Sequence, residues 1–170
     1  MAEMDYDAKT ALLIVDVQND FVDAQGNLYV KGGEQVVKPI NREIRRALNA
    51  GATVVYTRDW HPPETPHFAP FGGKWPVHCV RDTWGSEFHP DLDIATAGEH
   101  IHKATGLEDG YSAFSVQHLP TGEVRGTGLE AVRKGFEVTV LEEAVRAVEL
   151  APGDRDRTLE RLEHAGVRIA

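Results

Sequence analysis

The sequence predicts an α/β domain with a mostly parallel sheet flanked by helices. An apolar run at 11–15 ends at Asp16, as a buried parallel strand does. Apolar residues then recur at helical spacing over about 34–50. A β-branched and aromatic run follows at 53–57. This order of strand, helix and strand is that of a βαβ unit, so the strands are expected to be parallel.

The remaining elements are assigned from the same patterns. The helix over 34–50 buries a stripe formed by Val36, Val37, Ile40, Ile44, Ala47 and Leu48, and Gly51 is its stop signal. The later residues predict a short strand at 100–103, a helix at 129–134, a strand at 138–141 and a last helix at 155–165. The segment 58–90 has no helical or strand periodicity, and such a long irregular stretch is typical of a functional loop.

Composition favours one soluble domain over residues 1–170. Apolar residues make up 41% and charged residues 26% of the chain. The net charge of -9 disfavours nucleic acid and anionic membranes as partners. No apolar run approaches the roughly 20 residues that cross a bilayer, and the first residues lack the apolar region of a leader. We therefore expect a cytoplasmic protein that binds a small neutral or cationic molecule, with no nucleic-acid or membrane partner.

Four potential metal ligands occur within twenty residues of the irregular segment. They are Asp59, His61, His67 and His78. Prolines 62, 63, 66 and 76 prevent this segment from becoming helical, so the four side chains can converge on one ion. The alternative is an exposed histidine-rich loop that binds no metal.

Two further charged residues close predicted strands. Asp16 lies at the carboxyl end of the first strand, the edge at which open α/β sheets bind ligands. Its alternative role is that of a turn former or helix cap. Lys103 closes a short strand and is either a solvated charge or, beside a carboxylate, a group that stabilises an anion or lowers a thiol pKa.

Several motifs together resemble the nicotinamidases of the isochorismatase-like hydrolase family. In order they are LLIVDVQNDF, the glycine pair before the first helix, TRDWHPP, WPVHCV, the lysine strand and YSAF. The resemblance implies a three-layer, Rossmann-like fold and the hydrolysis of a carboxamide, nicotinamide, to nicotinate and ammonia in NAD salvage. An amidase for another small amide is the nearest alternative.

The resemblance also implies roles for individual residues. Asp16 and Lys103 would be catalytic together with a cysteine, and one divalent ion (zinc, iron or manganese) would be bound by Asp59, His61, His67 and His78. Phe21, Trp75 and Tyr111 match aromatic residues that hold the pyridine ring in the family. The alternative for these three is packing in the core or in loops.

One block of the family pattern is absent near 128–132. Where the family has a further strand, a Gly-Ala-Thr turn and the nucleophilic cysteine, Leu129 and Glu130 run directly into 131–134. About one βα unit is therefore expected to be missing, together with the backbone N–H groups of the oxyanion hole. Cys79 is the only cysteine, and we expect it to be structural because a nucleophile needs a base and oxyanion donors within reach.

A missing strand leaves a gap beside the first strand, where unpaired backbone groups cannot stay buried. We expect 138–141 to move next to 11–15 in a sheet of five strands or fewer. A homo-oligomer in which a partner chain supplies the strand is the alternative. Functionally, the chain is either an impaired nicotinamidase or a non-catalytic metal-binding member, unless the gap comes from an engineered deletion or a faulty gene model.

Overall fold

The computed structural model describes residues 4–107, 112–114, 127–149 and 151–170. Its helices, strands and 3₁₀ turns, in chain order, are β1 (Ala11–Val15), α1 (Asn19–Val22), η1 (Gly33–Val36), α2 (Val37–Asn49), β2 (Thr53–Asp59), η2 (Ala69–Phe71), η3 (Trp84–Ser86), β3 (Glu99–Lys103), α3 (Thr127–Arg133), β4 (Thr139–Val140), η4 (Glu142–Ala144), α4 (Asp154–His164) and β5 (Arg168–Ile169). Within the described ranges, no helix is long and apolar enough to cross a membrane.

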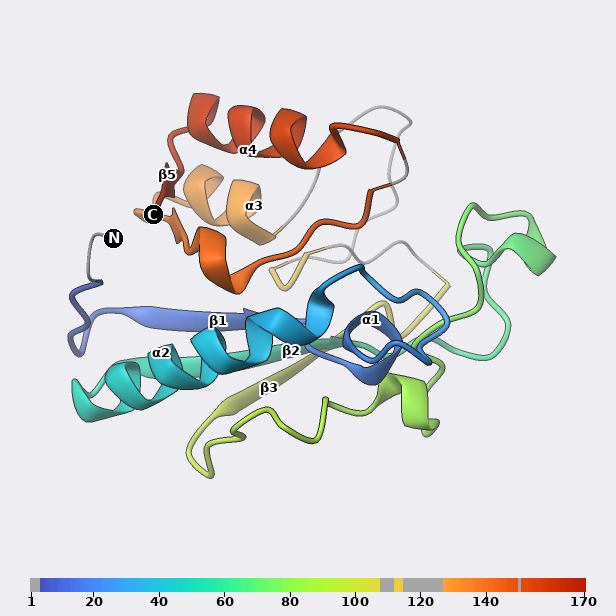
Figure 1. The fold of residues 1–170 in the computed structure, drawn as a ribbon, viewed down its shortest axis with the longest axis horizontal. Coiled ribbons are helices and arrows are strands. Elements are labelled where there is room, and N and C mark those ends of the chain that lie inside the picture. Colours follow the sequence, from blue (N-terminus) through green and yellow to red (C-terminus); the bar gives the residue numbers. More distant parts are fainter. Residues whose placement is uncertain (1–3, 108–111, 115–126, 150) are drawn as a thin grey trace.

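The main sheet has three parallel strands in the order β1-β2-β3 (Figure 1). The register pairs Val15 with Thr57 and Asp59 with Lys103, so the carboxyl ends of neighbouring strands lie at the same edge. This confirms the predicted α/β class with a parallel sheet. β2 is two residues longer than predicted, and its last residue is the candidate ligand Asp59.

The first crossover helix, α2, lies along the sheet and contacts β1 and β2. Its predicted apolar stripe is buried, with Ile44 1% and Ala47 0% exposed, except for Leu48 near the end of the helix, which is 41% exposed. The two buried side chains belong to one hydrophobic core with Ile14 of β1 and Tyr56 of β2. Gly51, at φ 74°, takes the left-handed conformation that ends many helices, as predicted.

The second group of elements forms a separate small sheet. β4 pairs in parallel with β5, and α4 connects the two strands. The prediction that 138–141 would lie beside 11–15 is therefore wrong: in the described part of the chain β1 pairs with β2 alone. Pairing with β5 closes a βαβ unit over one short helix, a more local arrangement than crossing to β1. Figure 1 shows α3 and α4 together on the side of β1 away from β3.

The later elements otherwise follow the predictions. The helix expected at 129–134 is α3, the strand at 138–141 is shortened to β4, and the last helix is α4. The short elements α1 and β5 were not predicted, because four and two residues are too few for a hydrophobic period to show. The irregular segment after β2 contains two 3₁₀ turns, η2 and η3.

Candidate metal and catalytic site

Three charged residues meet at the carboxyl edge of the main sheet. Asp16 follows β1, Asp59 ends β2 and Lys103 ends β3. The Lys103 Nζ lies 2.7 Å from Asp16 Oδ2 and 2.5 Å from Asp59 Oδ1. The lysine ammonium therefore bridges two carboxylates, as expected for polar residues that end neighbouring parallel strands.

Burial and the opposing charges set the protonation of this triplet. Burial by itself would raise the pKa of Asp59, but the Lys103 ammonium lowers it well below its ordinary value. Burial raises the pKa of Asp16, against the effect of Lys103 and together with the charge of Asp59. Burial would lower the pKa of Lys103, but the two carboxylates raise it on balance. The two carboxylates therefore keep Lys103 in its charged form.

The backbone turns sharply where two of these strands end. Asp16 has φ 57° and Ala104, directly after Lys103, has φ 55°. Non-glycine residues rarely adopt this left-handed conformation, and aspartate tolerates it better than most. Asp16 is also fixed by its side chain, since Thr57 Oγ1 donates a 2.7 Å hydrogen bond to its Oδ1. Asp16 therefore has the turn conformation that its alternative role requires, and its carboxylate also contacts Lys103; its catalytic role stays a prediction.

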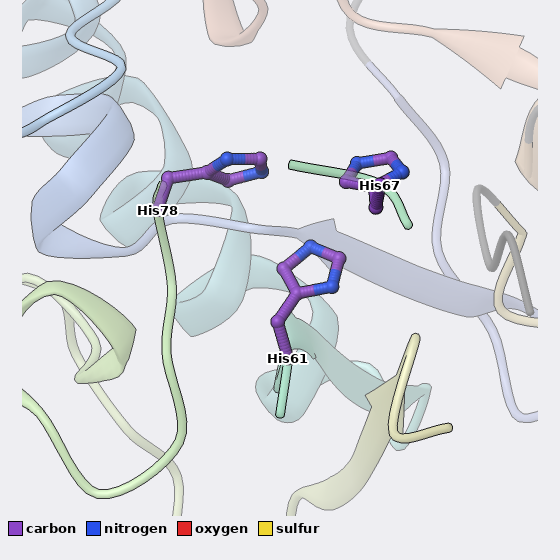
Figure 2. Close-up of side chains that lie close together, drawn as sticks. All are labelled: His61, His67 and His78. Atoms are coloured by element: carbon purple, nitrogen blue, oxygen red, sulfur yellow. The ribbon is translucent and has the colours of Figure 1, made fainter. Parts of the chain in front are cut away.

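Three of the four predicted metal ligands converge on one point. Side-chain atoms of His61, His67 and His78 lie within 4.8 Å of one another, and Figure 2 shows the three rings around a common space. His61 and His78 are buried, and His67 is half-buried. A cluster of this kind is the usual way to hold a divalent transition ion through imidazole nitrogens.

The residues present fit such an ion. The Nε2 of His61 is buried without a hydrogen-bond partner, an arrangement that costs free energy unless something binds there. His78 Nδ1 lies 2.8 Å from the carbonyl of Pro76, which leaves its other ring nitrogen for a ligand. Burial lowers the pKa of His78 to about 4, so the imidazole is neutral and can coordinate a metal near neutral pH.

Asp59 lies next to the histidines and is shared with the lysine. Its Oδ2 is 3.8 Å from His61 Nε2 and 4.0 Å from His78 Nε2, and its Oδ1 contacts Lys103. The carboxylate therefore connects the metal candidate to the predicted catalytic pair. The structure brings together Asp16, Lys103 and all four predicted ligands.

Aromatic rings surround the histidines. Trp75 stacks on His67 with ring centres 6.3 Å apart, and Phe21 approaches His78 at 5.5 Å. Both residues thus lie beside the histidine cluster, and their role as substrate contacts stays a prediction. Tyr111, the third predicted contact, lies outside the described residues. Phe68, which is fully buried, was missed: its ring packs 5.1 Å from that of His61, and a single phenylalanine in a loop gives no sequence signal.

Two buried polar side chains, one just before α1 and one within it, support the site and were also missed. Gln18 makes hydrogen bonds to the backbone of Asp59, and the Asp20 carboxylate accepts the backbone N–H of Cys79 at 2.6 Å. Gly85 leaves room for this carboxylate, since a Cβ at this position would lie 2.1 Å from it and would force Asp20 to move. The polar run between Val17 and Phe21 was the available signal, because such a run beside a buried strand needs internal partners.

The environment of Cys79 is that of a structural residue. The side chain is fully buried, and its Sγ lies 3.7 Å from the carbonyl of Gly85. Burial, with the nearby carboxylates, raises the pKa of the thiol far above its ordinary value. A thiol that stays protonated is a poor nucleophile. These contacts agree with the structural role expected for it.

Comparisons with known proteins identify the relatives of this arrangement. The isochorismatase domain family matches residues 10–121. The nicotinamidase of Escherichia coli is 30% identical, over 94% of this chain and 93% of its own length. That alignment spans 199 residues, more than the 170 of this chain, so part of the relative has no counterpart here.

Solved structures share the fold. The pyrazinamidase of Pyrococcus horikoshii in complex with zinc superposes with a TM-score of 0.84 at 35% identity, covering 95% of this chain and 98% of that one. PnC1 from L. infantum in complex with nicotinate gives a TM-score of 0.84 at 29% identity, covering 98% and 95% of the two chains.

Proposed function

This chain belongs to the isochorismatase family, and we propose that it is a nicotinamidase-type amidohydrolase whose own turnover is impaired. The observation that carries the substrate class is the joined site, in which a buried histidine cluster, two aromatic rings and an Asp-Lys pair meet at one sheet edge. Relatives named as nicotinamidases, and the neighbour bound to nicotinate, support a pyridine carboxamide as ligand.

His61, His67 and His78, with Asp59 beside them, would hold one divalent ion, and the zinc in the Pyrococcus neighbour supports this set. Bound there, the ion would supply a Lewis acid for a nitrogen donor of the substrate. Phe21 and Trp75 would hold the ring faces, so that the amide points toward Asp16 and Lys103. If the missing segment with its cysteine were present, Asp16 would take the proton of the thiol and Lys103 would stabilise the thiolate.

Impairment follows from the single cysteine. Cys79 is buried with a protonated thiol, and its backbone N–H is bound to Asp20 rather than turned toward a substrate. The metal and aromatic residues do not depend on the absent strand-helix unit, so ligand binding is expected to persist without turnover. A non-catalytic binding protein is the second candidate, favoured by this same separation of binding residues from the nucleophile.

The test combines ammonia release with ligand binding. With zinc bound, the chain should bind nicotinamide in calorimetry and bind benzamide, which lacks the ring nitrogen, much more weakly. Ammonia release should be about a millionfold slower than that of the E. coli relative, the usual effect of losing a nucleophile from a cooperating group.

A Cys79→Ser variant is the matched control and should leave both measurements unchanged. Rapid turnover that Cys79→Ser abolishes would make Cys79 the nucleophile, and rapid turnover that survives would require attack by water. Either result contradicts the proposed impairment. Equal binding of nicotinamide and benzamide would contradict the pyridine-binding site.

A further inference from the structure

Gln18 holds both backbone polar groups of a predicted metal ligand. Its Nε2 donates a 2.8 Å hydrogen bond to the carbonyl of Asp59, and its Oε1 accepts the Asp59 N–H at 2.8 Å. The side chain is fully buried between the ends of β1 and β2. One amide therefore replaces the partner that a neighbouring strand would offer to the last residue of β2.

The orientation of Asp59 matters because its two oxygens serve different groups. Oδ1 contacts Lys103 at 2.5 Å, and Oδ2 faces His61 and His78 at 3.8 and 4.0 Å. A change in the backbone dihedrals at Asp59 would turn the carboxylate away from one of these groups. Whatever holds the backbone of Asp59 therefore fixes the distance between Lys103 and the histidine cluster.

The same amide also binds a third point in the chain. Gln18 Nε2 lies 3.0 Å from the carbonyl of Ser86, and Ser86 is itself held by hydrogen bonds of its N–H and Oγ to the carbonyl of Thr83. Gln18 therefore ties η3 to the end of β2 from the inside of the protein. Its three hydrogen bonds use both donors and the acceptor of the amide, so no rotation of the side chain preserves them.

We propose that Gln18 is a positioning residue for the metal site: it fixes the backbone of Asp59 so that one carboxylate faces Lys103 and the histidine cluster at the same time. This inference rests on the metal site of the proposed function. The hydrogen bonds of the Gln18 side chain go to the backbone of Asp59 and Ser86 and not to the histidine cluster, so its removal should act through the position of Asp59. Residues that orient the ligands of a metal typically change its affinity by 10–100-fold when altered.

The chain contains a matched control for this amide. Asn41 Nδ2 donates to the carbonyl of Asp91 at 2.7 Å, and its Oδ1 accepts the N–H of Asp93 at 2.9 Å. This is the same two-sided contact with backbone, made by α2 on a loop that holds none of the candidate ligands. Gln18→Glu and Asn41→Asp make the same chemical change, since each keeps the acceptor and removes the donor.

Zinc affinity is measured for both variants by competition with a chelating dye, and cobalt absorption reports the geometry of the ligands. Gln18→Glu should weaken zinc binding about 10–100-fold and change the cobalt spectrum, whereas Asn41→Asp should stay within about twofold of the unaltered protein. Unchanged affinity and spectrum in a folded Gln18→Glu variant would overturn the proposal. So would an equal loss in Asn41→Asp.

A crystal structure of the metal-free Gln18→Asn variant tests the role of Gln18 independently of whether the site binds a metal. Gln18→Asn keeps the amide but shortens it by one methylene, so it cannot reach both Asp59 and Ser86. In the metal-free variant, the Asp59 carboxylate should have moved away from Lys103 or from His61. If the unaltered protein binds no zinc, the metal assignment fails alone, and an unmoved Asp59 in Gln18→Asn would still refute the role of Gln18.

Discussion

The part of the chain before Ala104 and the part from Thr127 onward differ in how much they bury. The first part contains the whole hydrophobic core and every buried charge of the described residues, including Asp59 and Lys103. From Thr127 onward, only Ala131 and Val167 are buried among the described residues, and α4 buries none. The candidate site is therefore built on the part that packs well.

This difference in packing between the two parts separates ligand binding from catalysis. The metal candidate and its supporting hydrogen bonds come from the first part, so they do not need the unit that the sequence resemblance predicts before GFEVTVL. The nucleophile and oxyanion donors would come from that unit, next to the weakly packed second part. We infer that ligand binding survives where catalysis does not, and four measurements test this contrast.

The largest effect is expected for the metal. His61→Ala combined with His67→Ala should reduce bound metal from about one equivalent to almost none, because two of three clustered imidazoles are lost. Metal analysis of protein purified without chelator gives the answer. The matched control combines His89→Ala with His164→Ala, which removes two histidines outside the cluster and should keep the ion. Equal metal contents in the two double variants would refute the site.

Lys103→Met should be the most destabilising single change. It removes the cation between Asp16 and Asp59 and leaves a half-buried and a buried carboxylate facing each other, at a cost of about 3–5 kcal/mol in the free energy of unfolding. Urea unfolding of the metal-free protein measures this cost. The control Lys134→Met, just after α3, replaces an exposed lysine and should change stability by less than about 0.5 kcal/mol. Similar costs for both would show that the triplet contributes little.

Truncating an apolar side chain should destabilise the first part of the chain more than the second. Ile44→Ala in α2 empties a site that is 1% exposed and should cost about 2–5 kcal/mol. Leu162→Ala in α4 removes a half-buried side chain, so its cost should stay below about 1.5 kcal/mol. The same urea experiment compares them. A larger cost for Leu162→Ala would mean that the second part is the better packed one.

A smaller effect is expected on the stability of the metal-free protein at acid pH. Burial lowers the pKa of His78 to about 4, below its ordinary value of 6.5, so the unfolded chain binds a proton over a range in which the folded chain does not. His78 stabilises nothing by charge; its burial as a neutral ring destabilises the fold as pH falls from 6.5 toward 4. The metal-free protein should lose up to about 3 kcal/mol over this range.

His78→Gln tests this assignment, because an amide does not titrate in this range. Stability measured at pH 7, 5.5 and 4.5 should fall less steeply in the variant than in the unaltered protein. Hydrogen exchange at the lower pH should show the added opening in the loop around His78 rather than in α4. Parallel pH curves for the two proteins would contradict the role of this histidine.

Sequence periodicity was sufficient for the local elements of the first part. The run at 11–15 and the spacing of Ile40, Ile44 and Ala47 record burial directly, since a parallel strand and a packed helix select apolar residues at fixed intervals. The same reasoning placed Asp16 and Lys103 at strand ends, and the proline-rich segment predicted the histidine cluster. The sequence also shows that Cys79 is the only cysteine, and the expected loss of turnover rests on this count.

Tertiary structure decided which groups pair across the chain. The pairing of β4 with β5 instead of β1, the approach of Lys103 to both carboxylates, and the contact of Gln18 with Asp59 all join residues that no local pattern relates. A strand has the same sequence pattern beside either neighbour, and a buried amide looks like any polar residue until its partners are known. Periodicity reports that a side chain is buried, whereas the identity of its partner depends on how distant segments fold together.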